Sequence, residues 1–143
     1  TIYDHTSYYA VLPREGFATG LEIQADAYRH SLIDAAELAR ELEVIIQEAK
    51  RKLDNPGALT TETLYALLHD RHRIRRWRMG MPDALRALRR DDVVGFYRNF
   101  YRPSNTILVV VGDVDVDETL DRVRALYGAL DDAPVTRTPG ERE

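Results

Sequence analysis

The sequence predicts an α+β layered domain, incomplete at its N-terminus, in which several helices pack on a mixed β-sheet. His5–Pro13 is rich in aromatic and β-branched residues and ends at a proline, which predicts a strand. Asn105–Asp115 contains a continuous apolar run, Ile107–Val111, between turn-forming residues, which predicts a strand buried on both faces. Because a stable sheet usually needs three or more strands, we expect the others to lie outside this chain.

The segments between and after these strands predict helices, from their apolar periodicity and capping residues. Asp34–Glu37 has the spacing of a capping box and opens the longest of them, which Asp54–Gly57 ends. The other predicted helices are Arg14–His30, Thr60–His69, Pro82–Leu88, Asp91–Tyr101 and a last one that Asp115 caps and that reaches Leu130. Residues 131–143 are predicted to be a linker or disordered tail.

The composition excludes several classes of protein. With 143 residues, 44% of them hydrophobic and 31% charged, the chain has the make-up of one soluble globular domain. No apolar run reaches membrane-spanning length, and Thr1 does not open a signal peptide, so no membrane partner is expected. A cleaved targeting segment would leave no trace, so the compartment stays open between cytoplasm and periplasm. The absence of cysteine excludes disulfides and thiolate chemistry.

Two glutamates stand out in the longest predicted helix. Glu41 and Glu48 are almost two turns apart and so lie on one stripe, to which Glu37 adds a third carboxylate. The stripe borders an apolar face made of Leu38, Leu42, Ile45, Ile46, Ala49 and Leu53. It is either a solvated stripe, with a Glu48–Lys52 pair worth roughly 0.2–0.5 kcal/mol, or part of a metal or catalytic site. The residues alone favour the solvated stripe.

Three stretches together resemble the M16 zinc peptidases, a family that includes insulinase, pitrilysin and the mitochondrial processing peptidases. They are Thr1, Thr6, Tyr8 and Tyr9; then RELEVIIQE from Arg40; then FYRNFYRPSNTILVVVGDVD from Phe96. The resemblance covers Thr1–Leu130 and implies that residues 1–130 are the C-terminal part of an M16-like peptidase domain. It also implies a peptide substrate and a second M16-like domain or subunit that closes over it.

The resemblance implies zinc as the cofactor of the intact protein. Family members bind zinc through H-x-x-E-H on one helix and a distant glutamate on another. By resemblance, Glu48 is that distant ligand and Glu41 is a supporting residue. The motif itself is missing: none of His5, His30, His69 and His72 begins or ends an H-x-x-E-H, and we interpret His69 and His72 as surface residues. The family spacing places the motif about 30 residues before Thr1, so this chain alone should be inactive.

Two other interpretations follow from the residues. Residues 71–90 contain eight arginines and one acid, Asp83, in a chain of net charge −4. Clustered arginines beside Trp77 could bind nucleic acid, but compositional bias on a solvated surface explains them better, so no nucleic-acid partner is expected. The second alternative is a non-catalytic M16-like subunit, which would keep the fold, lose the metal and form the other half of a peptidase chamber.

Overall fold

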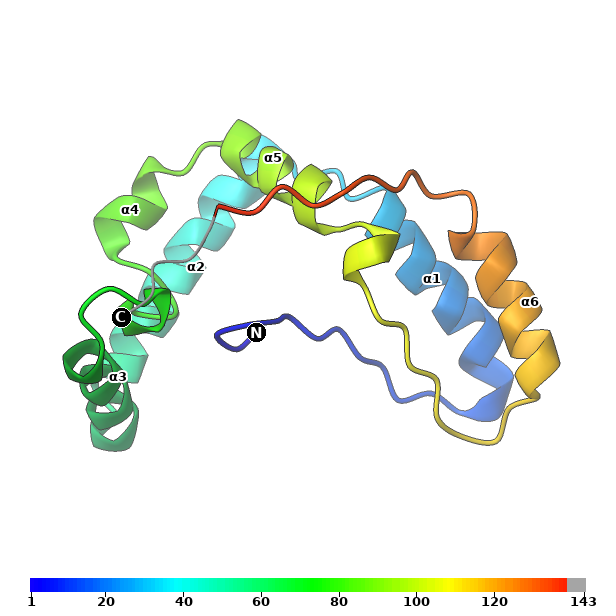
Figure 1. Ribbon diagram of the computed structural model, residues 1–143, viewed down its shortest axis with the longest axis horizontal. Coiled ribbons are helices and arrows are strands. Elements are labelled where there is room, and N and C mark those ends of the chain that lie inside the picture. The colour runs from blue at the N-terminus through cyan, green and yellow to red at the C-terminus, as the bar shows by residue number, and fades with distance from the viewer. Residues whose placement is uncertain (139–143) are drawn as a thin grey trace. The chain divides into compact units, whose positions relative to one another are not determined.

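The computed structural model describes residues 1–138, and its regular elements are all helical (Figure 1). The α-helices of this part are α1 (Phe17–Arg29), α2 (Ala35–Leu53), α3 (Pro56–Leu68), α4 (Pro82–Ala87), α5 (Arg90–Phe100) and α6 (Val116–Tyr127). Short 3-10 turns are η1 (Arg14–Gly16), η2 (Arg73–Arg75) and η3 (Pro103–Asn105). No helix in the described part is long and apolar enough to cross a membrane.

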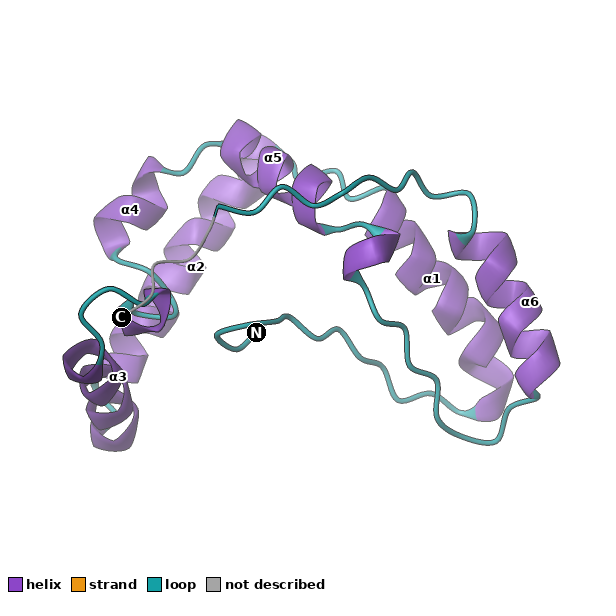
Figure 2. Cartoon of the chain, viewed as in Figure 1, coloured by secondary structure: helices purple, strands orange, loops and turns teal. Residues whose placement is uncertain are grey.

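The predicted α+β fold with a mixed sheet is wrong for residues 1–138, which contain no strand (Figure 2). Both predicted strands, 5–13 and 105–115, lack regular secondary structure apart from the short turn that ends at Asn105. Their apolar side chains are largely exposed: Val11 is 90% exposed and Ile107 89%. A strand is defined by hydrogen bonds to a neighbouring strand. A local pattern of β-branched residues reports the preference for an extended backbone and cannot supply that neighbour.

The helix predictions are confirmed, with boundaries that differ by a few residues: α1 begins at Phe17 after a 3-10 turn, and α6 ends at Tyr127 and not at Leu130. α3 begins at Pro56 and not near Thr60, because the Asn55 side chain accepts a hydrogen bond from the Ala58 amide at 3.0 Å. Proline is tolerated at the first helical position, where its missing N–H has no partner to lose. Asp54–Gly57 therefore ends α2, as predicted, and also starts α3. The predicted tail, 131–143, lies partly outside the described residues; within them, the Thr136 backbone is paired with the Asn99 side chain.

The chain divides into two compact units, each described here by itself. Of the described residues, the first comprises 1–7, 33–93 and 137–138, and in it α2 packs against α3 and α4. Leu42 and Ile46 are buried on the packed side of α2, and Ile46 has no exposed surface. Half-buried Leu38, Ile45 and Ala49 extend that side, while Leu53 is 43% exposed. The predicted core face of this helix is thus confirmed, apart from its last residue.

A buried carboxylate joins α2 to α3 in the same unit. Glu62 is only 4% exposed, and its carboxylate accepts hydrogen bonds from Lys52 Nζ and from the Arg78 amide, the latter at 3.3 Å. A buried charge is tolerated only when it is paired and hydrogen-bonded. This pair therefore ties the end of α2 to α3 and to the loop that follows α3.

The second unit comprises residues 8–32 and 94–136, with α1 packed beside α6 (Figure 1). Leu21 and Ala25 of α1 and Thr119 of α6 are its buried residues. Asp115 caps α6 as predicted: its carboxylate accepts a hydrogen bond from the Glu118 amide at 2.8 Å.

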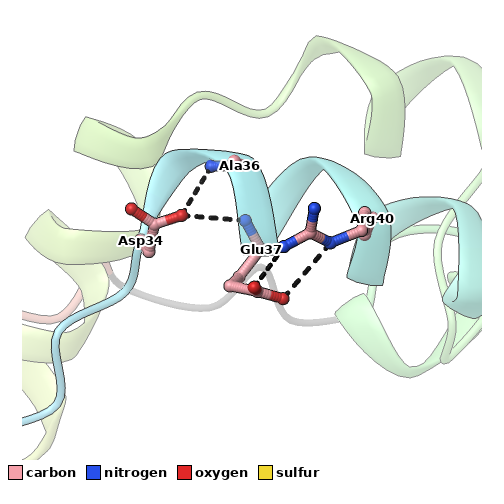
Figure 3. A network of polar contacts seen from close by, with 4 residues as sticks. All are labelled: Asp34, Ala36, Glu37 and Arg40. Atoms are coloured by element: carbon pink, nitrogen blue, oxygen red, sulfur yellow. Dashed lines mark hydrogen bonds and ion pairs between the residues drawn. The ribbon is translucent and has the colours of Figure 1, made fainter.

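The start of α2 is fixed by Asp34, as Figure 3 shows. One carboxylate oxygen accepts hydrogen bonds from the amides of Ala36, at 2.9 Å, and Glu37, at 3.0 Å. These bonds to the Glu37 and Ala36 amides lower the pKa of Asp34 below its ordinary value of 3.8. The cap therefore satisfies two amides that the helix itself cannot pair.

Replacing this cap should destabilise the chain in a pH-dependent manner. Asp34→Ala should lower the midpoint of urea unfolding near neutral pH. Asp34→Asn should lower it much less, because the asparagine side-chain oxygen can still cap the helix. Because folding lowers the pKa of Asp34, its contribution as a carboxylate is present above 3.8 and lost as the pH falls through the folded-state value. The difference between wild type and Asp34→Ala should therefore shrink in acid; a constant difference would contradict the charged cap.

Removing one partner of the buried ion pair should lower the free energy of unfolding more than removing both partners. Lys52→Met leaves the Glu62 carboxylate buried without its cation and should lower the free energy of unfolding by about 3 kcal/mol. Lys52→Met combined with Glu62→Leu should recover much of that loss, since no buried charge remains. Denaturant unfolding of the two single variants and the double variant provides the test; strictly additive losses would contradict the coupling.

Candidate functional site

α2 carries both predicted site residues on its solvent-facing side. Glu41 and Glu48 are exposed at the border of the apolar side, on which Leu42 and Ile46 are buried. The predicted Glu48–Lys52 pair does not form, because Lys52 pairs with the buried Glu62. Within residues 1–138, neither Glu41 nor Glu48 takes part in an ion pair or a side-chain hydrogen bond.

The remaining glutamates of α2 are both paired. Glu37 forms an ion pair with Arg40, one turn later, and accepts a hydrogen bond from Arg40 Nε at 3.3 Å (Figure 3). Glu43 accepts a hydrogen bond from Arg86 Nε at 3.1 Å. Glu37, the third carboxylate of the predicted stripe, is therefore held by a cation of its own helix. Of the four glutamates of α2, the two without a partner are the two that the resemblance selects.

The described part of the chain does not hold a complete metal site. It contains no cluster of three or more His, Cys, Asp or Glu side chains that could bind an ion. Two exposed carboxylates are suitable ligands for a divalent cation, but zinc sites use at least three protein ligands. The residues present could therefore supply a part of a zinc site, and the rest would have to come from residues beyond this chain.

The histidines are placed differently from the prediction in two cases. His5 and His30 are exposed, and His30 Nδ1 lies 2.7 Å from Asp26 Oδ1. His69 and His72, which we predicted to be surface residues, are half-buried; their ring centroids are 5.5 Å apart, and His69 also stacks on Tyr65. This aromatic packing follows from the return of the loop onto α3, which local sequence does not reveal.

A tyrosine network in the second unit was not predicted. The hydroxyls of Tyr8 and Tyr101 are 2.5 Å apart, and Tyr28 and Thr106 hydroxyls are 2.7 Å apart. Tyr97 donates a hydrogen bond to the Tyr28 carbonyl. Burial raises the pKa of Tyr101 well above its ordinary range, and the hydrogen bond to Tyr8 raises it further. The hydrogen bonds of this network connect α1 and α5 to the segments around Tyr8 and Thr106.

Comparison with known proteins relates most of the chain to peptidases. Residues 87–143 match the family model described as the Peptidase M16 inactive domain. An uncharacterized zinc protease of Rickettsia felis is 28% identical over 130 residues, which cover 91% of this chain and 32% of that protein. The beta subunit of the mitochondrial-processing peptidase of Homo sapiens is 27% identical over 128 residues, covering 90% of this chain and 26% of the subunit.

Solved structures give the same relationship at the level of the fold. The first half of the periplasmic protease PqqL from Escherichia coli matches with a TM-score of 0.75 and 22% identity, over 92% of this chain and 29% of that one. The chain spans about a third or less of the length of the curated relatives that it matches. These matches confirm the resemblance predicted from the sequence: residues 87–143 match an M16 family model, and the curated relatives and the solved structure align over about nine-tenths of the chain.

Proposed function

We propose that this chain is part of a zinc-dependent metalloendopeptidase that hydrolyses peptide bonds in peptides or unfolded segments. In the intact protein Glu48 would be one zinc ligand, and Glu41 would support the site. The observation that carries this proposal is the contrast along α2: Glu37 and Glu43 are paired, whereas Glu41 and Glu48 are exposed and have no partner in the described part of the chain. Relatives named zinc protease and mitochondrial-processing peptidase align over this region.

The chemistry assigned to each group follows from its type. A zinc ion held by two imidazoles and one carboxylate lowers the pKa of a bound water and polarises a peptide carbonyl. Glu48 would provide the carboxylate, and the two imidazoles would come from outside the chain. Glu41, nearly two turns earlier on the same stripe, would hold the ligands in place through hydrogen bonds, as outer carboxylates do in zinc sites.

A second M16-like domain or subunit is part of this proposal. The matching structure is the first half of a longer protease, so the relative contains at least one further part. In the proposed enzyme, that further part would close over a peptide bound beside α2. The described residues contain no metal-binding cluster, which fits a site assembled from several segments.

The alternative function is that of a non-catalytic M16-like partner, forming the second half of a peptidase chamber. One observation favours it: the family model that matches residues 87–143 is described as an inactive domain. In that case Glu41 and Glu48 would be solvated surface residues. The two functions differ in whether the intact protein binds zinc at all.

Substitution of Glu48 separates these functions. In the intact protein, Glu48→Gln should reduce zinc occupancy and peptidase activity together, because a neutral amide is a poor ligand for zinc. Zinc content after dialysis and cleavage of an unfolded peptide are the measurements. The matched control is Glu22→Gln, which neutralises an exposed glutamate of α1 and should change neither.

Glu41→Gln should have a smaller effect of the same kind, weakening zinc affinity by about 10–100-fold while a ligand remains at Glu48. Full zinc loading of Glu48→Gln would contradict the ligand assignment. An intact wild-type protein that binds no zinc would instead establish the non-catalytic alternative.

A further inference from the structure

We propose that the loop between α3 and α4 carries a docking surface for an acidic peptide segment of a partner protein. The surface, called here the arginine surface, consists of Arg71, Arg73, Arg75, Arg76 and Arg78, all exposed. It lies within the first compact unit. The proposal does not rest on the proposed peptidase function, because it uses neither Glu41 nor Glu48 and requires neither zinc nor catalysis.

The backbone beneath these arginines is held in a defined shape. The Arg73–Arg75 turn begins at His72, whose Nδ1 accepts a hydrogen bond from the Ile74 amide at 3.3 Å. The Arg78 amide is bound to the buried Glu62, and the Gly80 amide to the Trp77 carbonyl at 3.0 Å. Gly80 has a φ of +79°, a conformation that favours glycine and lets the chain turn toward α4. The loop is thus tied down at both of its ends.

The side chains of the loop are sorted between its two sides. His72, Ile74, Trp77 and Met79 are half-buried, whereas the five arginines between and beside them are exposed. This alternation gathers five positive charges within eight residues on the solvent side. Because the inward-facing residues anchor the loop, the guanidinium groups extend from a fixed backbone, so a partner loses less conformational entropy when it binds them.

The charge of the arginine surface is largely unpaired within residues 1–138. Arg71, Arg75, Arg76 and Arg78 form no ion pair with any described residue, and Arg73 reaches only Asp4, at 3.6 Å between two exposed side chains. Two of the three arginines that follow are used internally: Arg86 binds Glu43, and Arg90 Nε donates to the Ile33 carbonyl at 2.6 Å. The chain has 24 acidic residues for 20 Lys and Arg. A shortage of acidic residues therefore does not explain why these arginines are unpaired in the described part of the chain.

The observations favour carboxylates over nucleic-acid phosphates as the partner. Guanidinium groups bind both carboxylates and phosphates through two parallel hydrogen bonds, so the preference rests on the aromatic side chain and on the charge of the whole chain. Single-stranded nucleic acid would also need an aromatic platform, and Trp77 is half-buried under the loop. A long polyanion would meet the field of a chain with net charge −4. A short acidic peptide is affected mainly by charges within a Debye length, about 8–10 Å.

The test is binding of a short fluorescein-labelled peptide in which glutamate alternates with serine, followed by anisotropy on the full chain. Arg71→Gln, Arg75→Gln and Arg76→Gln combined should weaken binding about tenfold, as expected for three partly exposed charge pairs. The matched control combines Arg29→Gln, Arg51→Gln and Arg98→Gln, which removes the same charge from exposed positions elsewhere and should leave the affinity unchanged. Far-UV circular dichroism establishes that both variants keep the helical fold.

Three outcomes would overturn the proposal. The first is equal weakening in both triple variants, which would mean that only net charge matters. The second is no binding by the wild-type chain at about 50 mM salt, where such contacts are strongest. The third is that oligo(dT) of the same formal charge binds as tightly as the peptide through the same arginines, which would make the loop a nucleic-acid surface.

Discussion

The burial of one side of α2 is the constraint on which the candidate site depends. Ile46 and Leu42 are covered by the helices packed against α2, so the rotation of the helix about its own axis is fixed. Asp34 fixes where it begins, and the Lys52–Glu62 pair ties its last turn to α3. With rotation and both ends set, Glu41 and Glu48 can face only the solvent. The exposure of these two carboxylates is therefore a result of the packing of the apolar side of the helix.

The helices could be predicted from sequence because their determinants are local, and the sheet could not. The i, i+3, i+4 spacing of Leu38, Leu42, Ile45 and Ile46 and the caps at Asp34 and Asp115 act within a few residues, and all are found as expected. The apolar run Ile107–Val111 predicted a strand, but pairing requires another backbone, and none pairs with it within residues 1–138. The Lys52–Glu62 ion pair was not predicted for the same reason: it joins two helices, and the sequence of neither helix alone indicates it.

The residues of the candidate site were predicted partly from physical reasoning and partly from the family resemblance. Physical reasoning located the stripe of Glu37, Glu41 and Glu48 but could not rank its members. The structure pairs Glu37 with Arg40 and leaves the other two without a partner in the described chain, the division that the family pattern implies. The arginine surface is the converse case: its composition was evident, but only the fold separates the arginines used internally from those left facing solvent.

We propose that α2 contributes Glu48 to a metal site completed by residues outside this chain. The most direct measurement is a crystal structure of the intact protein grown with zinc, with anomalous diffraction collected at the zinc absorption edge. The account predicts an anomalous peak bonded to a carboxylate oxygen of Glu48, with Glu41 on the same side of the helix and imidazole ligands from another segment. A zinc peak away from α2, or none beside it at saturating zinc, would contradict the account.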